Sequence, residues 1–333
     1  MATRVGFDNY TINHLKLSAA ETLDFAVRHG LEGVQFLEPR SIDPELRPDA
    51  LAAFRKEADA RGLYLEVGLP SPSPVRVSRE LGHEVSPEAY AAELTRHVEA
   101  VAALGCSHAR AYIGDRHDRF RHDPPWCDQV DAARSTLRHL AAALRANGVR
   151  VAIENHADLA LAEHVELLDS LDPDLFGVTL DTGNILMRLD DSVRVVETLA
   201  PRVLCTHLKD CVLARTWRGL CWQARPVGSG ALPMGQLIDI LLKARPDQPL
   251  SIELHPRTYD LPTLDATWRD HFPGLSEETL SVANAVAQRC EERFHDGTLE
   301  RPEAVEAVPW ADRVEQWLDQ SVAFVRKHLG SRS

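Results

Sequence analysis

Long apolar runs are absent from this sequence, and no stretch approaches the ~20 residues that a helix needs to span a bilayer. The amino-terminal residues also lack a basic segment followed by an apolar one, which a secretory signal peptide requires. Internal repeats and low-complexity tracts are missing as well. From these absences we expect a soluble, cytoplasmic protein with no membrane partner.

Paired cysteines and an excess of positive charge are missing too. The six cysteines include no Cys-x-x-Cys pair, so we expect neither a disulfide framework nor a thiolate zinc site. Lys and Arg number 37 against 50 Asp and Glu, which gives a formal net charge of -13. A nucleic-acid groove needs clustered cations, so nucleic acid is not an expected partner. The charge does not exclude a small neutral sugar.

The sequence does contain a regular alternation of apolar, strand-like segments and amphipathic, helix-like segments. Several of the apolar segments are near-continuous Val, Ile and Leu runs, which is typical of parallel strands covered on both faces. Eight such units are enough to close a (β/α)8 TIM barrel, the fold that we predict. The expected strands are residues 4–7, 33–36, 64–68, 108–113, 151–154, 177–181, 203–207 and 250–253, and the expected helices are 19–29, 48–61, 87–103, 128–147 and 234–244.

Two regions depart from a minimal barrel. The Pro-rich segment 70–87 is too long for an ordinary connection, and it is either a lid over the site or a passive insertion. After residue 260, two stretches (275–293 and 308–329) have the pattern of helices. We therefore predict a barrel over residues 1–260 and a helical C-terminal extension over 261–333. That extension would pack on the barrel or on a partner subunit, as in a homo-oligomer.

Four of the expected strands end on a residue that could bind a metal ion. They are Val151-Ala-Ile-Glu154, Gly177-Val-Thr-Leu-Asp181, Val203-Leu-Cys-Thr-His207 and Leu250-Ser-Ile-Glu253. Taken singly, each has a simpler explanation: a strand-end acid bonded to backbone, a helix cap or a core histidine. All four stand at the strand end where TIM barrels carry their active sites, which favours one shared cation. Three carboxylates and one imidazole suit one divalent metal ion, with Mn²⁺ first and Mg²⁺ or Co²⁺ as alternatives, better than they suit zinc.

These segments and their neighbours resemble the xylose-isomerase-like TIM-barrel superfamily, in its sugar phosphate isomerase/epimerase family. The motifs, within residues 4–258, are Ile153-Glu-Asn-His156, Leu180-Asp-Thr-Gly-Asn184, Thr206-His-Leu-Lys-Asp210, Pro226-Val-Gly-Ser-Gly230 and Ile252-Glu253. The resemblance implies that the metal ligands are Glu154, Asp181, His207 and Glu253. Epimerase-type members often carry a second histidine shortly after the aspartate, where this chain has Asn184.

The activity that the resemblance implies is isomerisation or epimerisation of a ketose or keto-sugar through a metal-stabilised enediolate. The alternative is a lyase or dehydratase, which would eliminate a β-substituent from a keto-sugar, 3-keto-glycoside, inosose or dehydroshikimate. A bound cation would acidify the C–H next to a carbonyl, and two carboxylates would move the proton. The catalytic candidates are Glu154, Glu253, His156 and Lys209, and the substrate-binding candidates are Glu38, Asn184, Trp222, Arg225 and His255.

Some of these candidates have structural alternatives. His156 could pack behind Glu154, and Lys209 could pair with Asp210 or Glu253. Residues 222–225 are expected in a loop before Gly228-Ser-Gly230, where Trp222 would stack on a sugar or mark a subunit contact.

Two other classes of function compete with the sugar enzyme. A DNA-repair endonuclease on the same barrel would need more histidine ligands and a basic groove. A non-catalytic barrel would act as a binding or partner subunit, for which the C-terminal extension is the only hint. The negative charge argues against the first, and the retention of all four ligand types argues against the second.

Overall fold

The computed structural model describes residues 3–272 and 274–331, and its eight expected strands all form. They make one parallel sheet in the order β10-β1-β2-β3-β4-β5-β6-β7. The two ends of this order meet, because Leu208 bridges Ile252 in parallel. The fold is therefore a TIM barrel with a helical C-terminal region, as predicted. The strands are β1 (Val5–Asp8), β2 (Gly33–Phe36), β3 (Tyr64–Gly68), β4 (His108–Ala111), β5 (Arg150–Glu154), β6 (Phe176–Asp181), β7 (Val203–His207) and β10 (Leu250–Ile252).

The chain divides into two compact units. Unit 1 contains Met1–Lys16, Leu180–Pro201 and Thr206–Ser333, and unit 2 contains Leu17–Thr179 and Arg202–Cys205. This division does not follow the boundary at residue 260 that we expect from the sequence, and that boundary stays a prediction.

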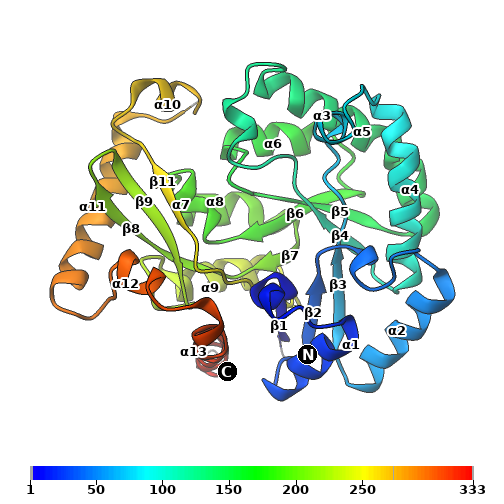
Figure 1. Ribbon diagram of the computed structural model, residues 1–333, viewed down its shortest axis with the longest axis horizontal. Coiled ribbons are helices and arrows are strands. Elements are labelled where there is room, and N and C mark those ends of the chain that lie inside the picture. The colour runs from blue at the N-terminus through cyan, green and yellow to red at the C-terminus, as the bar shows by residue number, and fades with distance from the viewer. Residues whose placement is uncertain (1–2, 273, 332–333) are drawn as a thin grey trace. The chain divides into compact units, whose positions relative to one another are not determined.

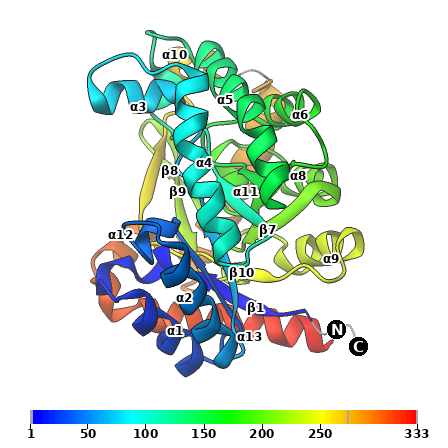
Figure 2. The ribbon, with the colours of Figure 1, turned by 90° about the vertical axis from the view of Figure 1, so that its right-hand side faces the viewer.

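Unit 2 contains the helices from α1 to α6, and α4 and α5 lie side by side in it (Figure 2). The first helix begins with a capping box, since Ser18 Oγ accepts from Glu21 N and Glu21 Oε2 accepts from Ser18 N. The helices are α1 (Ala19–Arg28), η2 (Pro39–Ser41), α2 (Pro48–Ala60), α3 (Pro74–Leu81), α4 (Pro87–Ala103), η3 (Asp118–Phe120), α5 (Trp126–Asn147) and α6 (Leu161–Asp169).

The Pro-rich segment 70–87 is not a plain loop, because it contains the helix α3. Pro74 occupies its first turn, where a missing N–H costs nothing, and Ser73 Oγ caps it by accepting from Arg76 N. The Pro-rich segment therefore contains a helix, which was not among those expected from the sequence.

Unit 1 contains an antiparallel sheet that the sequence analysis missed. Its order is β11-β9-β8, and helix α11 packs on β8 (Figure 1). The strands are β8 (Asp210–Thr216), β9 (Gly219–Arg225) and β11 (Thr258–Leu261). The expectation that residues 222–225 form a loop is wrong, since all of them lie on β9. A helix was expected after β7 because the barrel alternates strand and helix, whereas a hairpin comes first.

The helices of unit 1 include the C-terminal region. Helix α13 packs on β1 and β10, and Trp310 Nε1 donates to Thr11 O at 3.0 Å. Among the described residues, none of the helices is both long and apolar enough to cross a membrane. The helices are η1 (Asn9–Leu15), α7 (Asn184–Met187), α8 (Ser192–Leu199), α9 (Met234–Ala244), α10 (Ala266–Asp270), α11 (Glu277–His295), α12 (Pro302–Glu306), η5 (Trp310–Asp312) and α13 (Val314–Gly330), and η4 (Ala200–Arg202) follows α8 in the sequence.

Candidate metal centre

The four residues expected to bind a metal ion form a buried group that could hold one. Glu154, Asp181, His207 and Glu253 each offer one ligand atom, and these atoms lie within 4.8 Å of one another. Glu154, Asp181 and His207 are the last residues of β5, β6 and β7, and Glu253 directly follows β10. All four are at most 7% exposed.

Within unit 1, the Asp8 carboxylate lies beside the His207 ring. Asp8 is the last residue of β1, and its Oδ2 lies 3.2 Å from His207 Nε2. The other ring nitrogen, Nδ1, lies 3.5 Å from Glu253 Oε2 and 3.9 Å from Asp181 Oδ2. A carboxylate behind a histidine commonly fixes the tautomer and orientation of a metal-binding imidazole. Asp8 was missed by the sequence analysis, although it obeys the same strand-end rule: the expected strand stopped one residue short of it.

Lys209 contributes a buried positive charge between two of the carboxylates. Its Nζ lies 2.9 Å from Asp181 Oδ2 and 2.5 Å from Glu253 Oε2. Burial alone lowers the pKa of this amine, but the charges of Asp181 and Glu253 more than offset it and raise the pKa well above its usual value. The lysine stem passes close to the chain at Gly183, where a Cβ would lie 2.8 Å from Lys209 Cδ. Lys209 is therefore a buried ammonium that pairs with both carboxylates.

The remaining unit 1 candidates lie around Lys209 and Asp181. Asn184 N donates to Asp181 Oδ1 at 3.0 Å, so the backbone caps this carboxylate. His255 Nε2 is 3.5 Å from Lys209 Nζ, and the His255 ring is 5.5 Å from the Trp222 ring. Trp222 is fully buried and donates from Nε1 to Gly183 O at 3.0 Å, so it does not form an exposed subunit contact in this chain.

Arg225 has structural partners instead. Its guanidinium donates to Gln223 Oε1, to Ala224 O at 2.9 Å and to Glu300 O at 2.8 Å. Burial lowers its pKa to about 10. These contacts hold the segment before α12 against β9. A substrate role for Arg225 stays a prediction.

Within unit 2, Glu154 pairs with an arginine that the sequence analysis did not select. Arg110, on β4, donates from Nε to Glu154 Oε2 at 2.5 Å, and its Nη2 also contacts that oxygen. Its guanidinium lies 5.0 Å from the centre of the Tyr112 ring. His156 packs against the same ring at 5.1 Å, and its Nδ1 is 3.1 Å from Gly114 O. The only sequence signal for Arg110 was a charged residue inside an otherwise apolar strand.

The donor set fits a divalent cation. Metal–oxygen distances of about 2.1 Å place opposite ligands about 4.2 Å apart, so a spread of 4.8 Å needs only small side-chain shifts. In unit 1, the Lys209 ammonium contacts the carboxylates of Asp181 and Glu253, and the Asp8 carboxylate lies beside the His207 ring. A doubly charged cation would offset the excess negative charge.

Comparison with known proteins identifies the family of the chain. Residues 23–275 match the family described as xylose isomerase-like TIM barrel. This chain belongs to that family.

Three similar proteins illustrate the range of the family. The 3-oxo-isoapionate decarboxylase of Pectobacterium atrosepticum is 24% identical over 218 residues, which cover 65% of this chain and 70% of the relative. A structure of D-psicose 3-epimerase in the presence of D-fructose aligns with a TM-score of 0.58 and 15% identity, over 87% of this chain and 98% of the other. The IOLI protein with a bound zinc atom aligns with a TM-score of 0.56 and 14% identity, over 87% and 99%. The two structures support the fold alone.

Proposed function

We propose that this chain is a divalent-metal-dependent enzyme that isomerises or epimerises a ketose or keto-sugar. The observation that carries the proposal is the buried group of Glu154, Asp181, His207 and Glu253. A buried carboxylate is costly without a partner, and three of them around one imidazole are retained where a cation or a reaction requires them. Mn²⁺ is the ion that we expect, since oxygen ligands predominate.

A divalent ion bound there would polarise a substrate carbonyl oxygen and stabilise the negative charge that develops on it. The protein side chains would transfer the proton and bind the substrate. Glu154 and Glu253 would remove a proton from the carbon next to that carbonyl and return it. Arg110 and Lys209 would hold these two carboxylates in place, because each donates a charge-assisted hydrogen bond to one of them. His156 and His255 would bind substrate hydroxyl groups, as would Asn184.

A second candidate is a lyase, which the similarity to a decarboxylase favours. Isomerases, epimerases, eliminating lyases and decarboxylases that work beside a carbonyl share an enediolate or enolate. They differ in which bond to the neighbouring carbon breaks or forms next. Asn184, in place of the second histidine of epimerase-type relatives, also leaves this alternative open.

Solvent exchange tests the proposal. The enzyme loaded with Mn²⁺ is incubated in D₂O with ketoses and with 3-keto-glycosides, and NMR follows deuterium incorporation and product formation. Deuterium in a sugar with an unchanged carbon skeleton, or formation of an epimer, supports the isomerase or epimerase. Loss of a substituent from the sugar supports the lyase. Glu253→Gln should lower either rate by at least ~10²-fold, as removal of a general base does, while Glu278→Gln, an exposed control, should not. A Glu253→Gln variant with wild-type exchange would contradict the proposed role.

A further inference from the structure

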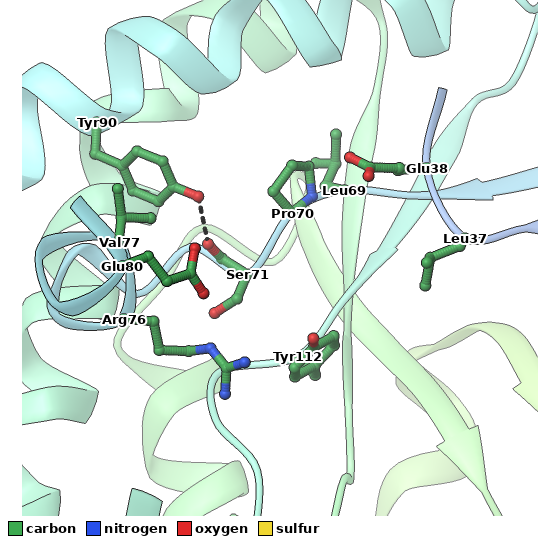
Figure 3. A pocket seen from close by; sticks show the side chains of 10 residues that line it. All are labelled: Leu37, Glu38, Leu69, Pro70, Ser71, Arg76, Val77, Glu80, Tyr90 and Tyr112. Carbon is green, nitrogen blue, oxygen red and sulfur yellow. Dashed lines mark hydrogen bonds between the residues drawn. The ribbon is translucent and has the colours of Figure 1, made fainter. Parts of the chain in front are cut away.

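A cavity of about 190 Å³ lies in unit 2 at the carboxyl ends of its strands (Figure 3). Leu37, Leu69 and Tyr112 each line it as the first residue after β2, β3 and β4. Helices α3 and α4 supply the other wall, through Arg76, Val77, Glu80 and Tyr90. At about 30 Å³ for each water in the liquid, the volume corresponds to about six waters. It is below the ~300–1,000 Å³ of drug-sized sites, so it suits one small group.

The cavity neighbours the Glu154 side chain within the same unit. The Tyr112 ring in its wall touches both Arg110, which binds Glu154, and His156. Glu154 also ends β5, the strand next to β4. A substrate whose reacting carbonyl lies near Glu154 would therefore have its remaining atoms close to this cavity.

The charges that line the cavity are mostly negative. Arg76 is engaged, because its Nη1 donates to Asp118 Oδ2 at 2.6 Å and to Asp115 Oδ2 at 3.3 Å. The carboxylates of Glu38 and Glu80 accept no hydrogen bond from any residue of the described ranges, 3–272 and 274–331. Burial raises the pKa of Glu38, with Arg40 opposing the effect.

Glu38 is half-buried and Glu80 is exposed at the rim, and carboxylates beside apolar side chains are groups that recognise a polyol. A carboxylate only accepts hydrogen bonds, so it pairs with hydroxyl donors and repels phosphate and carboxylate. Leu37, Leu69 and Pro70 offer apolar surface to C–H groups. The Tyr90 hydroxyl does not compete for a ligand, because it donates to Ser71 O at 2.9 Å (Figure 3).

We propose that this cavity, the polyol pocket, binds a neutral polyhydroxylated group of the substrate, with Glu38 and Glu80 accepting hydrogen bonds from its hydroxyls. The substrate would be an unphosphorylated sugar or glycoside that carries no carboxylate on this group. The proposal rests on the proposed function, since it assigns the pocket to the substrate of the Glu154 site.

The test measures binding without metal or turnover. Ligand-observed NMR in the presence of EDTA compares D-fructose with D-fructose 6-phosphate, and methyl D-glucoside with methyl D-glucuronide. The neutral sugar of at least one pair should bind with a dissociation constant of ~1 mM. Its charged counterpart should bind at least tenfold more weakly. Glu38→Gln and Glu80→Gln should each weaken binding of the neutral sugar about tenfold, the effect of losing a hydrogen bond to a charged group. Each substitution should also reduce the difference in affinity between the neutral sugar and its charged counterpart. Glu99→Gln, an exposed acid on α4, is the matched control and should change neither.

Three results would overturn the proposal: no neutral sugar binds, a charged sugar binds as tightly as its neutral partner, or the two Glu→Gln variants behave like Glu99→Gln. The metal content of each protein is measured in parallel. If the wild-type protein holds no metal and shows no exchange activity, the proposed function is wrong. That result is separate from the sugar-binding results, which test the polyol pocket.

Discussion

Lys209 is the residue whose environment most limits what the site can do. It is 2% exposed and touches the carboxylates of Asp181 and Glu253. Two buried carboxylates on one amine are stable only while that amine carries its proton, because removing one partner of a buried ion pair leaves an uncompensated charge. The sequence analysis left open whether Lys209 bonds a substrate or pairs with a carboxylate. The structure provides the pairing, and a substrate role stays a proposal.

Lys209→Met should lower the free energy of unfolding by about 3–5 kcal/mol, the usual loss when a buried ion pair is broken. The removed ammonium leaves Asp181 and Glu253 facing each other without a cation. Urea unfolding of the EDTA-treated protein, followed by circular dichroism, measures the change. Lys243→Met, on the exposed face of α9, serves as the control. A loss in Lys209→Met no larger than in the control would contradict this account of the site.

For single residues, the sequence predicted which side chains stand at the strand ends better than it predicted which side chains they contact. Glu154, Asp181 and His207 end apolar strands, and this placement alone indicated a common site. The pairing of Arg110 with Glu154 could not be predicted, because it joins neighbouring strands whose register is known only from the folded sheet.

Among the elements, the turn that follows β9 depends on a single buried carboxylate. Asp210, the first residue of β8, accepts hydrogen bonds from the backbone N–H groups of Cys211, Gly228, Gly230 and Leu232. Burial raises its pKa to about 6, although these four donors favour the charged form. The motif Pro226-Val-Gly-Ser-Gly230 is thus a turn wrapped around Asp210.

Gly230→Ala should destabilise this turn. Its Cβ would overlap the Asp210 carboxylate and the Cys211 carbonyl, so the chain must move and lose hydrogen bonds to Asp210. We expect a loss of about 1–3 kcal/mol in the free energy of unfolding, as for other steric disruptions of a packed network. Gly330→Ala is the control, since a Cβ at that position would meet nothing within 4 Å. Equal thermal midpoints for the two variants would show that the turn tolerates a side chain.

The elements that the sequence predicted are those whose burial pattern is local. Most barrel strands are short and largely apolar, and each long helix has a 3.6-residue apolar repeat, so both kinds of element were found. The β8–β9 hairpin was missed because its strands are buried partly by α11, which follows more than 50 residues later in the sequence. Because a helix distant in the sequence helps to bury these strands, their own residues do not show a regular alternation of apolar and polar side chains.

The whole molecule should lose stability in mild acid, because unit 2 buries two neutral histidines. Burial lowers the pKa of His97 to about 4, with Arg40 and Arg96 adding to the effect, and burial lowers that of His164 to about 4. The unfolded chain, with a histidine pKa near 6.5, takes up protons first as the pH falls. Stability is therefore present above pH 6.5 and is lost between pH 6.5 and 4.

For each histidine the loss at pH 5 should be about 2 kcal/mol relative to pH 7. Urea titrations of the wild type, His97→Leu and His164→Leu at both pH values measure it. Each variant should show a smaller difference between the two pH values than the wild type, whatever its absolute stability. A difference that is the same in all three proteins would mean that other groups control the acid response.

The central claim is that one divalent cation binds to Glu154, Asp181, His207 and Glu253, and metal stoichiometry tests it most directly. The protein is saturated with Mn²⁺, freed of excess ion and analysed by elemental mass spectrometry, together with Glu154→Gln, His207→Ala and the exposed control His139→Ala. We predict one equivalent in the wild type and in the control, and much less in the two site variants. A wild-type protein that retains no divalent ion, or a His207→Ala variant that retains a full equivalent, would contradict the account.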